Sequence, residues 1–234
     1  MVLGIYTATG IEVALDAGGK QVALAGAGAA LESLLRLITE GLRDASATLG
    51  DISLIGVCTG PGSFTGLRIG VAFAKSLAQA RNLPIIGISS YEVASFGEVT
   101  YPLVSVARGK PGYYYAKVSR GLDTAASFVA GERETIEQAA SACSPKAKIV
   151  GPDFYSKQPG ESAYAVAYLA KRARESGAPA HWTNIAIDYG QRPNAVVNFE
   201  RRRRQPQGGR TFAGANQRRN EGPASPAFDR PHDE

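Results

Sequence analysis

The chain has 234 residues, of which 44% are hydrophobic and 20% charged, and its formal net charge is +5. This length can bury a core without disulfides, and two lobes are expected. The only cysteines, Cys58 and Cys143, fit a reducing compartment. No apolar run approaches the roughly 20 residues of a membrane span, and the N-terminus lacks the positive region of a secretory signal. We therefore expect a cytoplasmic protein without a membrane partner.

The first part of the chain predicts a mixed α/β lobe. Closely spaced apolar segments with turn residues between them predict hairpin-linked, antiparallel strands. Strands separated by helices must instead return in parallel, so the whole order is typical of a ribonuclease H-like lobe. Gly50 is the expected stop of the first helix. The expected elements are strands at 2–8, 10–17 and 20–26, a helix at 29–50, a strand at 51–60, a helix at 63–82 and a strand at 83–89.

The second part repeats this order and suggests an actin-like duplication, with a junction near residues 95–100. The fold class is therefore α/β, with two ribonuclease H-like lobes of the actin-like ATPase superfamily. Its elements are expected to be strands at 101–109, 112–121 and 125–131, a helix at 131–143, a strand at 147–153 and a helix at 161–178. We place the N-terminal, dimerising lobe at 1–97, the smaller C-terminal lobe at 98–200 and a disordered tail at 201–234.

The tail carries most of the excess positive charge. Residues 201–234 hold 8 of the 26 Lys and Arg residues but 4 of the 21 Asp and Glu residues. With few apolar residues it cannot offset its ordering entropy. It either only solubilises the protein or contacts RNA phosphates. The candidate RNA contacts are Arg201, Arg202, Arg203 and Arg204.

The stretch "CTGPGSFTGLRIG" at 58–70 looks at first like a phosphate-binding loop. It lacks the Lys of a Walker loop, the third Gly of a dinucleotide fingerprint and the flanking Gly residues of a nucleophile elbow. What remains is a tight turn and a helix start capped by Ser63, which can accept from the amide of Thr65 or Gly66. Exposed amides there could attract an anion. The candidate anion contacts are Gly60, Gly62, Ser63, Thr65 and Arg68.

A ridge of small side chains follows within the same helix. Gly66, Gly70, Ala74 and Ala78 recur every four residues and so share one face. Each interior glycine costs about 1 kcal/mol relative to alanine, so close packing must offset it. The ridge admits either an element of its own lobe, such as the helix before it, or a partner helix.

Catalytic groups are scarce. His181 and His232 are the only histidines, and they do not make a zinc site. An actin-like phosphotransferase typically needs an Asp at the end of its first strand to organise magnesium, and Tyr6 holds that place. We expect no catalytic residue, metal or cofactor in this chain.

Residues 60–92, "GPGSFTGLRIGVAFAKSLAQARNLPIIGISSYE", closely resemble the signature of the bacterial TsaB (YeaZ) family. The resemblance is good to about residue 120, weaker to about 195 and absent in the tail. It implies two actin-like lobes and a non-catalytic paralogue of TsaD. TsaD transfers threonylcarbamoyl to adenosine 37 of tRNAs that read codons beginning with A.

The resemblance also implies partners. The family pairs with TsaD through first-lobe helices, and the ATPase TsaE joins that complex, so ATP, ADP and magnesium belong to the partner subunits. A homodimer through the same helices is the other expected assembly. The interface residues that the resemblance implies here are Leu31, Leu34, Leu35, Ile38, Leu42, Gly66, Gly70, Ala74 and Ala78.

The sequence departs from the family at polar positions. The first strand usually reads "IDTS", and here Tyr6 and Ala8 replace its Asp and Ser; a usual "HSE" before the first helix is missing. Val106 replaces the Asp of a "DAR" motif. These losses fit a scaffold that binds and positions TsaD.

Three other functions remain open at this stage. One is an actin-like ATPase or kinase with Ser63, Thr65 and Arg68 around phosphate, which Tyr6 and Val106 disfavour. A peptidase would need a metal site or triad that the sequence lacks. The last is direct tRNA binding by the tail, with an affinity that falls as salt rises.

Overall fold

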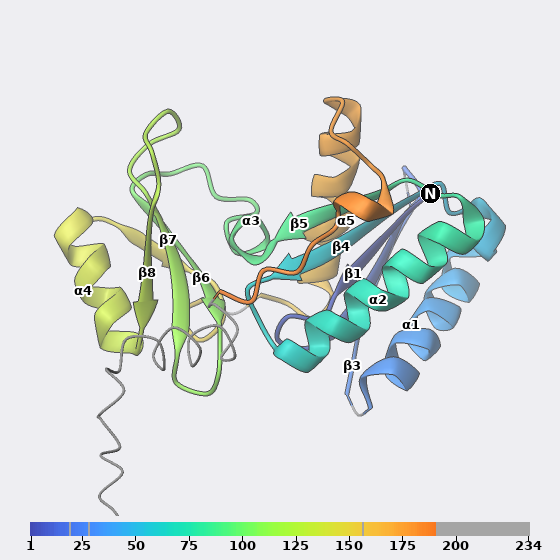
Figure 1. Cartoon of the computed structure of the whole chain (residues 1–234), viewed down its shortest axis with the longest axis horizontal. Helices are drawn as coiled ribbons and strands as arrows, with labels where there is room; N and C mark the ends of the chain where they lie inside the picture. The colour runs from blue at the N-terminus through green and yellow to red at the C-terminus, as the bar shows by residue number, and fades with distance from the viewer. Residues whose placement is uncertain (19, 28, 156, 191–234) are drawn as a thin grey trace, which may run out of the picture. The chain divides into compact units, whose positions relative to one another are not determined.

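Five strands form the first sheet of the computed structural model (Figure 1). Their spatial order is β3-β2-β1-β4-β5, antiparallel from β3 to β1 and parallel from β1 to β5. This confirms the mixed sheet expected for the first lobe. The strands are β1 (Val2–Tyr6), β2 (Ile11–Asp16), β3 (Gln21–Gly26), β4 (Leu54–Gly60) and β5 (Ile85–Ser89). The structure describes residues 1–18, 20–27, 29–155 and 157–190.

Helices α1 (Ala30–Ala45) and α2 (Phe64–Arg81) cover one face of this sheet. Because strand side chains alternate, Leu3 and Ile5 of β1 point into the same core as Leu34 of α1. This core is the larger apolar cluster of the first lobe.

Helix α1 ends earlier than the sequence predicts. Its C-cap is Ser46, in the left-handed conformation, and the Ser46 amide donates to Arg43 O at 2.9 Å. Gly50 lies instead in a separate 3-10 turn, η1 (Leu49–Asp51), which is held by hydrogen bonds from Thr48 to Asp51 Oδ2. The predicted stop at Gly50 is therefore wrong, because side-chain bonds of Thr48 and Asp51 compete with helix continuation.

Helix α5 (Glu161–Glu175) covers the opposite face of the first sheet. It presents a row of alanines, and two glycines of the sheet let its backbone approach closely. A Cβ on Gly4 would lie 2.8 Å from Ala167 N, and one on Gly56 would lie 2.8 Å from Val166 O. Such contacts gain dispersion energy along the helix only while both positions lack side chains.

The second sheet has the order β8-β7-β6-β9. A hairpin joins β6 to β7, as predicted across Lys110–Gly112, and β6 pairs in parallel with β9. Ile136 and Ala140 of α4 pack on this sheet, whereas α3 follows β5 directly and contacts β6. The elements are α3 (Ser90–Ala94), β6 (Leu103–Arg108), β7 (Tyr114–Ser119), β8 (Ser127–Gly131), α4 (Arg133–Cys143) and β9 (Lys148–Val150).

The expected lobe boundaries need a correction. Residues 161–190 lie within the predicted second lobe, 98–200, but α5 packs on the first sheet, and so do Trp182, Ile185 and Ile187 after it. The described residues belong to a single compact unit. The duplication fails at α5 because its narrow alanine face fits the glycine-bearing strands of the first sheet.

Candidate functional site

A cavity of about 250 Å³ lies between the ends of β1 and β2, α3, β6 and the loop before α5. It is lined by polar side chains from both sheets. Three of them decide its chemistry: Tyr6, Glu12 and Asp153.

Tyr6 closes the cavity at the end of β1. Its side chain is 4% exposed, and its hydroxyl forms a hydrogen bond with Thr9 Oγ1 at 3.1 Å. Burial, aided by the neighbouring Cys58, raises the pKa of the Tyr6 phenol above its ordinary value of 10. The position expected to hold a magnesium-organising Asp therefore holds a buried, neutral phenol.

Glu12 of β2 caps helix α5 from 150 residues away. Its Oε2 accepts from the amides of Ser162 at 2.9 Å and Ala163 at 3.2 Å. These donors belong to the first turn of α5, where they have no partner within the helix and where the helix dipole favours a negative charge. The carboxylate thus occupies the helix N-terminus that could otherwise bind a phosphate.

We expect the substitution Glu12→Gln to make stability less dependent on pH. Burial raises the pKa of Glu12 above 4.5, and the amide bonds from Ala163 and Ser162 only partly oppose it. A raised folded pKa gives stability that is fully present below the unfolded pKa and is lost as the pH rises through the folded pKa. Between pH 4 and 7, the wild type should therefore lose free energy of unfolding relative to Glu12→Gln, as urea denaturation at several pH values would show. A difference that is constant over this range would contradict the assignment.

The opposite wall of the cavity is held by an ion pair. Arg108 donates from Nε to Asp153 Oδ2 at 2.8 Å and from Nη2 to Asp153 Oδ1. The Tyr114 hydroxyl also donates to Asp153 Oδ2, at 3.1 Å. Burial raises the pKa of Asp153, but the bonds from Arg108 and Tyr114 outweigh it and keep that pKa below its ordinary value. Val106 beside them is fully buried.

Both carboxylates of the cavity are thus already bonded to protein groups. Within the described ranges, no group of three or more His, Cys, Asp or Glu side chains could hold a metal ion. The residues present do not fit a magnesium nucleotide, since Tyr6 and Val106 supply no oxygen ligand of the kind that magnesium prefers.

The signature loop forms the capped turn that the sequence predicts. Ser63 is the N-cap of α2, and its Oγ accepts from Gly66 N at 3.2 Å. The Ser63 amide donates to Ala8 O at 2.7 Å. Thr65 and Arg68 are exposed, and the guanidinium of Arg68 lies over the Phe64 ring at 5.2 Å. Gly60 and Gly62 lie against Asp188 and Ala8, so anion binding by this loop stays a prediction.

The small-residue ridge packs inside its own lobe. Cβ atoms on Gly66 and Gly70 would overlap Thr7, at the end of β1, and Ala74 and Ala78 are buried in the core. The glycines of the ridge therefore pack against the residue that follows β1, and its alanines lie in the core that α1 shares. Gly70, Ala74 and Ala78 are buried, whereas Gly66 is partly exposed, and partner contact by the ridge stays a prediction.

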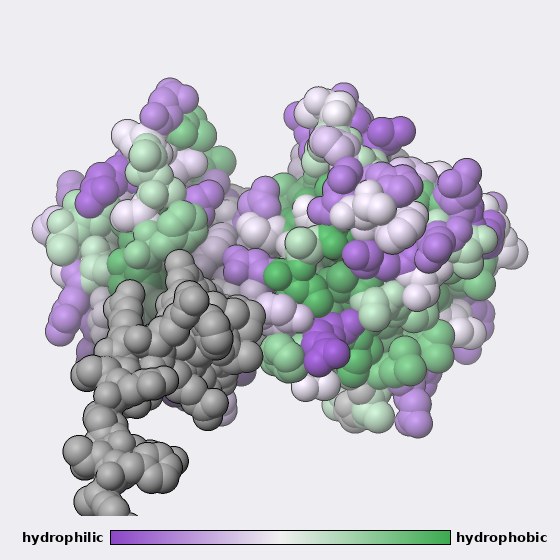
Figure 2. Space-filling view, in the orientation of Figure 1, coloured by the Kyte–Doolittle hydropathy of each residue, from purple (hydrophilic) through white to green (hydrophobic). Residues whose placement is uncertain are grey.

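The apolar residues of α1 are divided between the core and the surface. Leu34, Ile38 and Leu42 are between 0% and 8% exposed and lie in the first-lobe core, whereas Leu31 and Leu35 are each 50% exposed. The expected interface must be corrected accordingly, because three of its five α1 residues point at their own sheet. Figure 2 shows hydrophobic surface over the α1 and α2 part of the molecule, mixed with polar residues.

Residues 178–190, which we call the strap, were missed by sequence reasoning. The strap follows α5, contains the 3-10 turn η2 (Trp182–Asn184) and runs beside β5 and α2 (Figure 1). Ile85 N donates to Ala180 O at 3.0 Å, and Asp188 N donates to Thr59 O at 2.8 Å. Alternating Ile185, Ile187 and Tyr189 were the available signal for an extended, half-buried segment.

The strap is also tied to α2 by side chains. Lys75 Nζ donates to Ile185 O at 3.1 Å and lies over the Trp182 ring, and the rings of Phe64 and Tyr189 are 4.9 Å apart. His181 is exposed and bonds Thr183 Oγ1 at 2.7 Å, which agrees with a surface role. The strap thereby covers one flank of α2.

Two further expectations concern the tail and the membrane. Arg201, Arg202, Arg203 and Arg204, together with the predicted disordered tail, fall outside the described residues. None of the helices in the described ranges is both long and apolar enough to cross a bilayer.

Comparison with known proteins adds a family and a fold. The family model described as "TsaD: tRNA N6-adenosine threonylcarbamoyltransferase" matches residues 13–142. The tRNA N6-adenosine threonylcarbamoyltransferase of Polynucleobacter asymbioticus is 33% identical over 151 residues, which cover 62% of this chain and 39% of the relative. The enzyme of the same name from Clostridium novyi is 35% identical over 91 residues, covering 39% and 26%. This chain thus spans well under half the length of these relatives.

A solved structure shares the architecture. YeaZ from Pseudomonas aeruginosa superposes with a TM-score of 0.63 over 80% of this chain and 98% of that one, at 19% sequence identity. The likeness shows that the described residues have a YeaZ-like fold.

Proposed function

We propose that this chain, which belongs to the tRNA N6-adenosine threonylcarbamoyltransferase (TsaD) family, is an accessory subunit of a tRNA-modifying complex. That complex makes N6-threonylcarbamoyladenosine at position 37 of tRNAs that read codons beginning with A. In this role the chain binds and positions the catalytic subunit TsaD, and TsaE joins the pair. The observation that carries the proposal is the apolar surface that α1 exposes on the family-matched lobe.

That surface is defined by two helices. Leu31 and Leu35 of α1 lie one turn apart and are each half exposed. Ile69, Phe73 and Leu77 of α2 recur every four residues and are partly exposed. On the helical wheel they lie on the flank opposite Lys75, which the strap covers. We call these five residues the α1/α2 face.

The α1/α2 face has the composition of a docking surface. The half-exposed leucines of α1 and the partly exposed Phe73 form its centre, and charged pairs, Arg36 with Glu40 and Arg43 with Asp44, lie beside them on α1. Interfaces commonly combine such an apolar centre with a polar rim. Helices of another subunit could pack against it with ridges in grooves.

A non-catalytic role is supported by the cavity. Its first-strand position holds the buried phenol of Tyr6, and the carboxylates of Glu12 and Asp153 are bonded to α5 and Arg108. An actin-like phosphotransferase would need these groups for magnesium and phosphate. The same observations disfavour that alternative function.

We expect Leu35→Asp to abolish co-purification with TsaD. A charge placed in a desolvated interface costs at least as much as truncation of a hot spot, about 2 kcal/mol, which weakens binding by roughly 30-fold or more. Affinity would be measured by calorimetry with purified TsaD. Because Leu35 is half exposed, the variant should keep the circular-dichroism spectrum and melting temperature of the wild type.

The matched control is Leu122→Asp, which makes the same change at a side chain that is 84% exposed and distant in sequence. It should bind TsaD like the wild type. If Leu35→Asp and Leu122→Asp both retain full affinity, the α1/α2 face is not the docking surface. Sizing of the isolated chain tests the homodimer: the same Leu35→Asp change should then convert a dimer to a monomer.

A further inference from the structure

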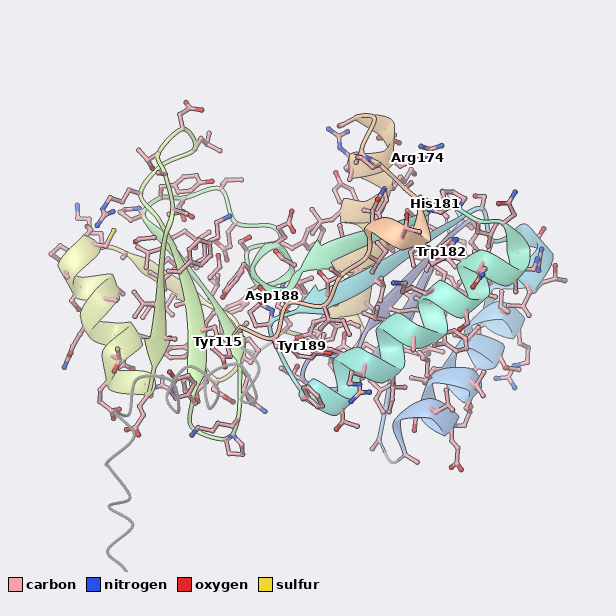
Figure 3. All side chains as sticks on the ribbon, viewed as in Figure 1. Tyr115, Arg174, His181, Trp182, Asp188 and Tyr189 are labelled. Carbon is pink, nitrogen blue, oxygen red and sulfur yellow. The ribbon has the colours of Figure 1, made fainter. Side chains whose placement is uncertain are left out.

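A second, smaller cavity lies where the strap ends against the second sheet. Its volume is about 240 Å³, and its walls come from α3, β7, β8 and the last described residues of the strap. The side chains that matter are those of Tyr91, Tyr115, Phe128 and Asp188, with Gly190 beside them. Figure 3 shows Asp188 on the strap near Tyr115 of β7. No step of the proposed scaffold function uses this cavity.

Three aromatic rings build its walls. Tyr91 and Tyr115 are 9% and 6% exposed and are thus fixed by packing, whereas Phe128 is 66% exposed at the mouth. The rings of Tyr91 and Phe128 are 5.7 Å apart and inclined by 58°. At this spacing the two rings contact each other and no group fits between them, so the accessible aromatic surface is mainly that of Phe128.

The strap brings a carboxylate to these rings. Gly190 lies directly on Tyr115, since a Cβ there would be 2.8 Å from ring atoms Cε2 and Cζ. Asp188 is exposed and lines the cavity, and its Oδ1 accepts from Gly190 N at 2.8 Å. Among the described residues, no cationic side chain forms an ion pair with Asp188.

The electrical character of the cavity is therefore negative. Burial first, and then the nearby Asp188 carboxylate, raises the pKa of Tyr91 to about 12, so the phenol stays neutral and the carboxylate carries the charge. The faces of the aromatic rings add the negative end of their quadrupoles. An anion would be repelled here, and a single carboxylate gives too few oxygen ligands for a calcium or magnesium ion.

The same aromatic cluster already attracts a cation at its other side. Tyr113 packs edge-on against Tyr115 with ring centroids 5.6 Å apart, and Lys110 Nζ lies over the Tyr113 ring at 5.5 Å. That ring does not line the cavity, so Lys110 does not fill it. The cavity beside it offers a better site, because it combines ring faces with a carboxylate.

We propose that the cavity formed by Tyr91, Tyr115, Phe128 and Asp188 binds an organic cation, namely the alkylammonium or guanidinium group of a small molecule or a peptide side chain. Aromatic faces attract such a cation while tolerating its apolar surface. Asp188 supplies the neutralising charge. The mouth at Phe128 gives access from solvent.

The test is a titration of the full chain, carrying ring-labelled tyrosine and phenylalanine, with tetramethylammonium chloride, followed by nuclear magnetic resonance. Ring signals should shift and saturate. The neutral isostere tert-butanol, at the same concentrations and at matched salt, should bind at least tenfold more weakly. N-acetyl-arginine amide is titrated in parallel, and whichever cation binds more tightly identifies the source as a quaternary ammonium or an arginine side chain.

Variants test whether this cavity is the site of cation binding. Asp188→Asn keeps the oxygen that accepts from Gly190 and removes only the charge, so it should weaken cation binding by about fivefold, as expected for an exposed carboxylate, while leaving the melting temperature within the experimental error. Asp123→Asn makes the same charge change at an exposed position and should leave the affinity within twofold of wild type. Phe128→Leu should weaken binding at least threefold.

Any of three results would overturn the proposal. One is equal binding of tetramethylammonium and tert-butanol, and another is an undiminished affinity in Asp188→Asn. The absence of a saturable shift with both cations is the third. Because Phe128 is largely exposed, Phe128→Leu remains an informative variant should Asp188→Asn prove unstable.

Discussion

Replacing Gly4 with valine should lower the free energy of unfolding by about 3 kcal/mol or more, because overpacking against backbone cannot be relieved by a side-chain rotation. Gly4 lies in β1 under helix α5, where a Cβ would be 2.9 Å from Ala167 Cβ and would overlap Ala163 O. The helix would have to move off the sheet. For a chain of this size we expect a fall in Tm of roughly 10 °C, measured by circular dichroism and urea denaturation.

Gly10 provides the matched control. A Cβ at Gly10 meets no atom within 4 Å, and the residue is exposed. Gly10→Val should therefore change the free energy of unfolding by less than about 0.5 kcal/mol, as is usual at exposed sites. A comparable loss at Gly4 and Gly10 would mean that α5 does not rest on the backbone of β1.

Gly70→Ala should destabilise the protein even though alanine is the better helix former. In an unhindered helix this change gains about 1 kcal/mol. Here the new methyl group would overlap the side chain of Thr7, which is only 2% exposed and cannot swing into solvent. We expect a net loss of about 1 to 3 kcal/mol, which is typical of overpacking. Urea denaturation would measure it.

A compensating substitution separates this steric cause from any other. Thr7 Oγ1 is buried without a hydrogen-bond partner among the described residues, so Thr7→Ala sacrifices no polar contact of that atom. In the Thr7→Ala background only the Cβ of residue 7 remains close, at 3.1 Å, so Gly70→Ala should cost at least about 1 kcal/mol less there than in the wild type. If Gly70→Ala costs the same in both backgrounds, then the ridge is not packed against Thr7. Ala72→Leu, on the exposed face of α2, should be near neutral.

Local signals predicted most of the first sheet. Apolar runs separated by Thr9-Gly10 gave the hairpin, because such turn residues act within a few positions of themselves. The start of α2 was equally readable, since the Ser63 cap and the Gly66 amide are three residues apart. The second hairpin, around Lys110–Gly112, followed from the same kind of pattern.

Long-range packing could not be predicted. Nothing within α5 itself says that its alanines rest on Gly4 and Gly56 of the first sheet, and the segment order alone favoured the second lobe. The small side chains of the α2 ridge were recognised, but the residue that packs against its glycines, Thr7, lies some sixty residues earlier. A repeat of small residues indicates close approach without saying to what.

The candidate site likewise combines a local feature that the sequence predicts with long-range contacts that it does not. Tyr6 was identified from its place at the end of a predicted strand, and in the structure it ends β1 with a buried side chain. The bonds from Glu12 to the start of α5 and from Arg108 to Asp153 join residues 150 and 45 positions apart. Such pairs leave no trace in a single sequence, so the capacity of the cavity for phosphate could be judged only from the fold.

The position of α5 also determines when the first lobe can finish folding during synthesis. The first lobe needs residues from β1 at one end of the described chain and from α5 and the strap near the other. Until the ribosome has released residues 161–190, the face of the sheet that carries Val2, Ala14 and Cys58 has no helix to cover it. Domains usually fold from the N-terminus as they emerge. In this protein the lobe that begins first is completed last, and an exposed apolar sheet must be kept from other chains meanwhile.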